Sequence, residues 1–126
     1  MFSFFQYKQM LTKVDIIKET VEYYRHHKRS MNGLYCSYIH NGLRCAFSRC
    51  CMDDPQTTNK LQAREGKGVS EFDVKLDELL KPEYRGHDLA FWCHIQRLHD
   101  TISFWKDREL SESGHRYVDY LLQTYK

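Results

Sequence analysis

Residues 34–49 read LYCSYIHNGLRCAFSR, in which Asn41-Gly42 separates two runs of largely apolar and aromatic residues. Asn-Gly is the pair most favoured in a two-residue type I′ turn, because both central residues of that turn need a positive φ. The stretch therefore predicts a β-hairpin with strands 34–40 and 43–49. This hairpin decides the fold class, because an antiparallel pair with one apolar face needs helices to cover it.

The register of the hairpin divides its side chains between two faces. The facing pairs are His40 with Leu43, Tyr38 with Cys45, and Cys36 with Phe47. A period of two then gathers on one apolar face Leu34, Cys36, Tyr38, Cys45 and Phe47. We expect Arg44 to project from the opposite face, free of the core.

Helical patterns precede and follow the hairpin. Thr12, with Asp15 three residues later, marks the start of a helix that ends near residue 28, where the run RHHKR (25–29) suits the negative end of a helix dipole. Residues 52–68 are polar and contain a proline and two glycines, which predicts a loop. Ser70 and Asp88 are expected to begin two further helices, and residues 117–125 to lie in the last one. The expected apolar stripes are Val14, Ile17, Val21 and Tyr24; Phe72, Leu76, Leu79 and Leu80; Phe91, Ile95, Leu98, Ile102 and Trp105; and Tyr117, Val118, Leu121, Leu122 and Tyr125.

The predicted fold class is α+β: an N-terminal helix, a small antiparallel hairpin sheet, and three C-terminal helical segments packed on it. A length of 126 residues, with 41% hydrophobic and 29% charged residues, fits one domain. We assign residues 10–126 to that domain. Residues 1–9 are expected to be a loosely attached extension, because Met10 resembles a second start.

Composition also limits where the protein is expected to be located and which partners it is expected to have. Because no apolar run approaches the roughly 20 residues that span a bilayer, we expect no membrane insertion. Five cysteines without a secretory signal ahead of them indicate free thiols in a reducing cytoplasm. Aromatic residues make up 14% of this small chain, which favours a homo-oligomer, a symmetric dimer.

The net charge of +2 is unevenly distributed along the chain. Residues 1–51 hold 8 Lys and Arg against 3 Asp and Glu, whereas residues 52–126 hold 11 against 14. A basic half attracts phosphate, and arginine with tyrosine supplies phosphate-pairing forks and stacking planes. The candidate ligand-binding residues are Arg25, Arg29, Tyr35, Tyr38, Arg44, Arg49, Tyr84 and Arg85. The partners that fit them are an anionic small molecule such as a nucleotide, a host protein, or nucleic acid, and no cofactor is expected.

Catalytic alternatives have weaker patterns. His87-Asp88 and His99-Asp100 are His-Asp pairs like those of metal-dependent phosphohydrolases of the HD type, and His99 with Asp100 would be the metal ligands. His94 and His99 are, however, five residues apart and point about 140° away from one another on a helix. Structural zinc requires two short cysteine spacings, and only Cys45 and Cys50 approach one. No neighbouring residue marks a cysteine as an activated nucleophile. Binding without catalysis is therefore the favoured function.

The order of several short motifs resembles an uncharacterised family of small proteins of tailed phages, plasmids and bacterial genomes. The motifs are Cys36-Ser37-Tyr38, Gly42-Leu43-Arg44-Cys45-Ala46, Met52-Asp53-Asp54, Glu65-Gly66, and Leu98-His99-Asp100 followed by Trp105. The chain departs from the family at Phe47-Ser48-Arg49, where members have Val-Gly-Cys. The resemblance implies a mobile-element origin, and with it host takeover or counter-defence, by sequestering a nucleotide signal or blocking a host protein. The location would then be the host cytoplasm.

Overall fold

The chain folds into helices and short hairpins in the α+β class, as expected. This computed structural model describes residues 9–32 and 35–126, and only the backbone of residues 32, 35 and 36. The extension expected at residues 1–9 lies, apart from residue 9, outside the described residues. The described elements are α1 (Lys13–His26), β1 (Met31–Asn32), β2 (Tyr35–Cys36), β3 (Ile39–His40), β4 (Leu43–Arg44), η1 (Ser48–Cys50), α2 (Pro55–Gln62), η2 (Val69–Glu71), η3 (Leu76–Glu78), η4 (Pro82–Tyr84), α3 (Leu89–Asp100), η5 (Ile102–Phe104), β5 (Trp105–Lys106), β6 (Glu109–Leu110) and α4 (Glu112–Thr124), where η marks a 3₁₀ turn.

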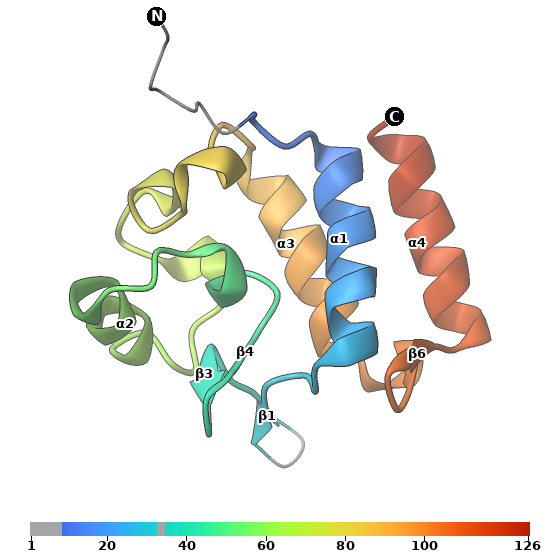
Figure 1. Cartoon of the computed structure of the whole chain (residues 1–126), viewed down its shortest axis with the longest axis horizontal. Coiled ribbons are helices and arrows are strands. Elements are labelled where there is room, and N and C mark those ends of the chain that lie inside the picture. Colours follow the sequence, from blue (N-terminus) through green and yellow to red (C-terminus); the bar gives the residue numbers. More distant parts are fainter. Residues whose placement is uncertain (1–8, 33–34) are drawn as a thin grey trace, which may run out of the picture.

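Helices α1, α3 and α4 contact one another and form one half of the molecule (Figure 1). The segment from β1 to η4 forms the other half, with α2 at its outer edge. A single hydrophobic cluster extends through both halves and includes Phe47, Trp92 and Ile95 among its fully buried side chains. No described helix is both long and apolar enough to cross a membrane.

Helix α1 begins at the expected capping box. The Asp15 backbone N–H donates to Thr12 Oγ1, and the Thr12 N–H donates to Asp15 Oδ2, each over 3.0 Å. Ile17 and Tyr24 of the expected stripe are buried, but Val14 and Val21 are only partly covered. Ile16 and Thr20 are buried in their place, so the buried face is rotated from the one that the apolar residues alone predict.

The Asn41-Gly42 turn is confirmed. Asn41 has φ 52° and Gly42 φ 78°, as a type I′ turn requires, and β3 pairs with β4 in the expected register, His40 opposite Leu43. The Cys45 N–H donates to the Tyr38 carbonyl over 3.2 Å, which confirms that facing pair too.

The hairpin is shorter than predicted. After Arg44 the chain turns into η1, and the Ser48 hydroxyl donates to the Tyr38 carbonyl over 2.5 Å in place of a longer ladder. On the other strand, Cys36 pairs with Met31 in a separate β1–β2 hairpin. The predicted facing of Cys36 with Phe47 is therefore wrong. The Leu34 and Cys36 side chains lie outside the described residues.

The segment expected to be a loop, residues 52–68, contains helix α2. Asp54 is its N-cap and accepts a 2.7 Å bond from the Thr57 N–H, and Pro55 occupies the first turn, where its missing N–H costs nothing. Leu61 anchors the helix in the core. The proline interpreted as a loop signal is a helix-start signal.

The helix expected from Ser70 to Leu80 is replaced by two 3₁₀ turns, η2 and η3. The Gly68 N–H donates to Glu71 and the Lys75 N–H to Glu78, so each turn is closed by its own carboxylate. Leu79 and Leu80 are still buried, so the prediction that they belong to the core is confirmed although the predicted helix is wrong.

Helix α3 begins after Asp88 as predicted, but it is shorter than its expected stripe. Phe91, Ile95 and Leu98 are buried, whereas Ile102 is 48% exposed because the helix ends at Asp100. Trp105 reaches the core from β5, and its Nε1–H donates to the Leu98 carbonyl over 2.8 Å.

Gly114 allows α4 to approach η5 closely. Helix α4 starts at Glu112, with Ser111 as N-cap, so Gly114 lies in its first turn. A Cβ atom at Gly114 would lie 2.1 Å from the Phe104 carbonyl oxygen. Any side chain there would force the helix away from η5.

We expect Gly42→Val to lower the free energy of unfolding by about 1–2 kcal/mol, because a β-branched residue is strained at a positive φ. Urea unfolding measures this. Gly68→Val is the matched control, since Gly68 is exposed with φ −71° and its Cβ would meet its neighbours at 3.6 Å, an ordinary contact. Equal losses in both variants would contradict the type I′ assignment.

Candidate functional site

Arg49 is one of the predicted ligand-binding arginines, and the fold covers its side chain almost completely. Its side chain is 7% exposed, and its Nη1 donates to Glu19 Oε1 over 2.8 Å while Nη2 donates to Thr20 Oγ1 over 3.1 Å. The Tyr84 hydroxyl donates to the same Glu19 oxygen over 2.5 Å. Burial, followed by this hydrogen bond, raises the pKa of Tyr84. Arg49 and Tyr84 therefore connect α1, η1 and η4 rather than face a ligand.

Arg44 is not free of the core, contrary to the sequence-based expectation. Its Nη2 lies 3.0 Å from Asp53 Oδ1, and its side chain is only 22% exposed. Its Nη1 donates to the Ser48 carbonyl over 3.4 Å. The guanidinium thus joins β4 to the segment before α2.

Two further predicted residues hold loops in place. Tyr38 is buried, its N–H donates to Glu65 Oε1 over 2.7 Å, and its hydroxyl donates to the Lys67 carbonyl. Arg85 Nε donates to the Leu80 carbonyl over 3.0 Å. The Tyr35 side chain lies outside the described residues.

Arg29, His99 and Asp100 form a second internal cluster. Arg29 Nη1 donates to the His99 carbonyl over 2.6 Å and its guanidinium lies 5.5 Å from the Trp105 ring centre. His99 Nε2 accepts the Ser30 N–H at 3.2 Å, so its proton is on Nδ1 and is donated to Asp100 Oδ1 over 2.7 Å.

This hydrogen bonding bears on the metal alternative. Burial lowers the pKa of His99, which favours the neutral ring that the two bonds require. Both ring nitrogens are used, so His99 has no lone pair for a metal ion. Within residues 9–32 and 35–126, no group of three or more His, Cys, Asp or Glu side chains could hold one.

The described cysteines are poorly ionised. Burial raises the pKa of Cys45 to about 11 and that of Cys50 to about 12, and it also raises the pKa of Cys51. Cys93 is half-buried, and its pKa is raised by burial as well. A thiolate nucleophile needs the opposite shift.

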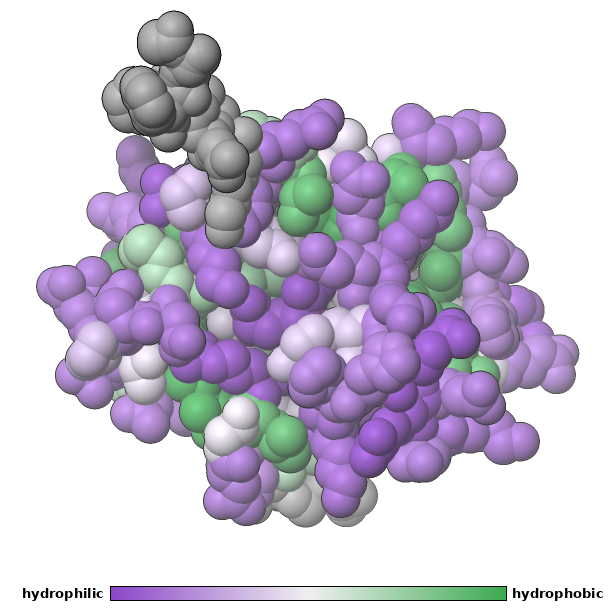
Figure 2. All heavy atoms as spheres, in the orientation of Figure 1, coloured by the Kyte–Doolittle hydropathy of each residue, from purple (hydrophilic) through white to green (hydrophobic). Residues whose placement is uncertain are grey.

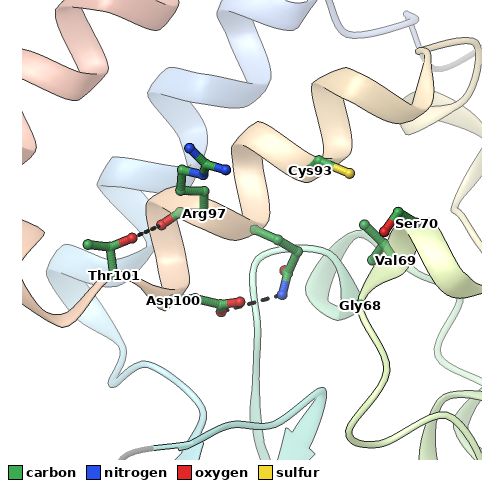
Figure 3. A pocket seen from close by; sticks show the side chains of 8 residues that line it. Gly68, Val69, Ser70, Cys93, Arg97, Asp100 and Thr101 are labelled. Carbon is green, nitrogen blue, oxygen red and sulfur yellow. Dashed lines mark hydrogen bonds between the residues drawn. The ribbon is translucent and has the colours of Figure 1, made fainter.

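A hollow of about 330 Å³ lies between α3 and η2 (Figure 3). Cys93 points from α3 toward Val69, and Gln96 Nε2 lies 3.5 Å from Asp100 Oδ1. The Asp100 carboxylate, already bonded to His99, and the Arg97 side chain both line this hollow, so its wall carries one charge of each sign.

The remaining predicted arginine, Arg25, lines a different cavity of about 260 Å³. This cavity is bounded by α1, the β5–β6 hairpin and α4, and we call it the basic cavity. Its lining residues are Val21, Arg25, Arg108, Glu109, Leu110 and His115. Figure 2 shows hydrophilic side chains gathered over the lower end of α1 and the hairpin beside it.

Charge in the basic cavity comes from three separate elements. Arg25 Nε lies 3.4 Å from Glu22 Oε1, in a pair that is more than half exposed. Arg108 and His115 are exposed, and their side chains have no hydrogen-bond or ion-pair partner among the described residues. The cavity therefore offers one guanidinium, that of Arg108, and one imidazole ring, that of His115, which no described side chain engages.

Sequence reasoning found Arg25 but missed Arg108 and His115. The missed signal is the polar run 106–109 between Trp105 and Leu110, which forms the β5–β6 turn with Asp107 at φ 60°. The sequence pattern places Trp105 in a helical stripe and therefore does not predict this hairpin.

Comparison with protein-family models, with curated proteins and with solved structures gives no match. The resemblance to phage and plasmid proteins stays a prediction from the short motifs.

We expect Cys93 to react first with a disulfide reagent in the native protein, and Cys45, Cys50 and Cys51 at least about tenfold more slowly, because each is buried and protonated. The Cys36→Ser variant is used, so that Cys36 does not contribute. Mass spectrometry of partly modified protein identifies the labelled thiol. Early labelling of Cys50 would contradict the described burial.

Removing the buried arginine should destabilise the fold. Arg49→Met is expected to lower the free energy of unfolding by about 3 kcal/mol, because Glu19 and Thr20 lose their shared donor. Arg44→Met is the matched control: it removes a pair whose Asp53 partner is largely exposed, and should cost about 1 kcal/mol or less. Urea unfolding compares them, and equal losses would show that Arg49 is no more structural than Arg44.

Proposed function

We propose that this chain is a non-enzymatic binding protein that holds a nucleotide-like, phosphate-bearing small molecule in the basic cavity. The observation that carries the proposal is the cavity itself, in which Arg25 and Arg108 from separate elements line one space with His115. Guanidinium groups suit phosphate because each presents paired N–H donors to two oxygens.

The other lining residues favour a nucleotide over a free phosphate ion. Val21 and Leu110 supply an apolar wall for carbon atoms of a ligand. The Glu109 carboxylate accepts hydrogen bonds, which suits sugar hydroxyls and repels a bare phosphate. About 260 Å³ is close to the lower size of small-molecule sites, so the phosphate and sugar would fill the cavity and the base would lie at its mouth.

Binding without catalysis is supported by the state of the reactive groups. The thiols of Cys45, Cys50 and Cys51 are buried with raised pKa values, and both nitrogens of His99 are engaged. The resemblance to phage and plasmid proteins supports a role in host takeover or counter-defence, in which holding a nucleotide signal would be sufficient. The symmetric dimer expected from composition stays a prediction.

Isothermal titration with ADP, adenosine and pyrophosphate tests the proposal. We expect ADP to bind and adenosine not to, because the arginines recognise the diphosphate. Arg108→Glu should weaken ADP binding at least tenfold, as expected for loss of a charged hydrogen bond and reversal of the charge. Arg108→Lys should weaken it less, because the charge remains and the fork is lost.

The control variant is Lys75→Glu, which reverses an exposed cation beside η3, outside the basic cavity. It should bind ADP as the unaltered protein does. Failure of folded protein to bind either ADP or pyrophosphate, or unchanged ADP binding by Arg108→Glu, would overturn the proposal.

A further inference from the structure

Five aromatic rings form a continuous row where α3 and α4 meet. In order of contact they are Phe104, Tyr117, Tyr120, His94 and Tyr125, with neighbouring ring centres 4.8, 6.1, 6.4 and 5.8 Å apart. His94 Nδ1 lies 2.7 Å from the Tyr125 hydroxyl, which fixes both rings. Tyr120 is 55% exposed, so the row is open to solvent at its centre.

Positive charge flanks this aromatic row. Arg97 on α3 is exposed and has no ion-pair partner among the described residues. Arg97 follows His94 by three residues on α3, so the two side chains are neighbours on the surface of that helix, and the Arg97 charge opposes the rise that burial causes in the pKa of Tyr117. Arg116 lies one turn before Tyr120 on α4, in an exposed pair with Glu112 that solvent screens.

The carboxylates of α3 and α4 are directed elsewhere or already paired. Asp100 bonds to His99 and, together with Arg97, lines the hollow beside η2. Asp119 lies about 160° from Tyr117 and about 100° from Tyr120 around the helix. Glu112 is 2.8 Å from Arg116. The row therefore combines one exposed ring, that of Tyr120, with partly covered neighbours and the Arg97 guanidinium, unpaired among the described residues.

One buried donor in the row also lacks a partner. The Tyr117 hydroxyl is covered and makes no hydrogen bond with any described residue. A polar group entering beside it would gain a bond that the free protein does not have.

We infer that this aromatic row binds single-stranded nucleic acid, with bases stacking on Tyr120 and its neighbours and phosphates contacting Arg97 and Arg116. Stacking on aromatic side chains contributes roughly 1–3 kcal/mol per base and accepts any base, so binding would be largely independent of sequence. The site is separate from the basic cavity, which Arg25, Arg108 and His115 form on the other flank of α4. A free mononucleotide would use only one ring and one arginine of the row.

The test is fluorescence anisotropy with a labelled twelve-residue oligothymidylate and a base-free deoxyribose-phosphate oligomer of the same length. We expect the oligothymidylate to bind more tightly, because stacking needs bases. Two phosphate contacts predict that its affinity falls about sevenfold between 50 and 200 mM salt.

Variants separate the row from the rest of the surface. Tyr120→Ala should weaken binding of the oligothymidylate about tenfold, whereas Tyr120→Phe, which keeps the ring, should leave it unchanged. Arg97→Glu should also weaken it. Arg25→Glu, a charge reversal in the basic cavity, should not, so the two sites fail or succeed independently.

Because Tyr120 and Arg97 are exposed, we expect variants at these positions to fold, and circular dichroism checks this. Equal affinity for the base-free oligomer would show plain charge attraction and would overturn the inference. Unchanged binding by Tyr120→Ala, or tighter binding of polyglutamate than of the oligothymidylate, would do the same, the latter favouring an acidic protein partner.

Discussion

A buried guanidinium has to be bonded on several sides at once, and the arrangement of the two halves of this molecule depends on that requirement. Arg49 takes Glu19 and Thr20 from α1 and shares Glu19 with Tyr84 from η4. An unpaired charge left in the interior costs several kcal/mol, so none of these segments can move away alone. The cluster thereby ties η1 and η4 to α1.

That requirement also explains why the candidate site could be predicted only in part. The sequence shows which residues can bind phosphate, but not which ones an acid of the same chain already neutralises. Arg49 forms an ion pair with Glu19, which lies 30 positions earlier in the chain. Arg44 pairs with Asp53 because the chain turns through η1 between them. Arg25 was identified from the end of its own helix. Arg108 and His115 join it only through tertiary packing, which no local pattern reports.

The fold was predictable where a signal is complete within a few residues. The capping box at Thr12 and the turn at Asn41-Gly42 are both of this kind, and both are confirmed. The lengths of the elements were not predictable, because tertiary contacts set them. Strand β4 ends at Arg44, and the Ser48 hydroxyl donates to the Tyr38 carbonyl in place of a longer ladder. Helix α2 was missed because an Asp-Pro pair marks a helix start as readily as a loop.

The close approach of Gly114 to Phe104 affects how this chain can vary. Helix α4 carries His115 toward the basic cavity on one flank and Tyr117 toward the aromatic row on the other. Single substitutions of its outward side chains can change the ligand preference of the basic cavity or of the aromatic row and leave the other surface unaltered. The glycine between helix and η5 has no such freedom, because a single added carbon would lie 2.1 Å from a backbone oxygen. The two surfaces can thus change independently of one another, but both depend on Gly114, which cannot be replaced.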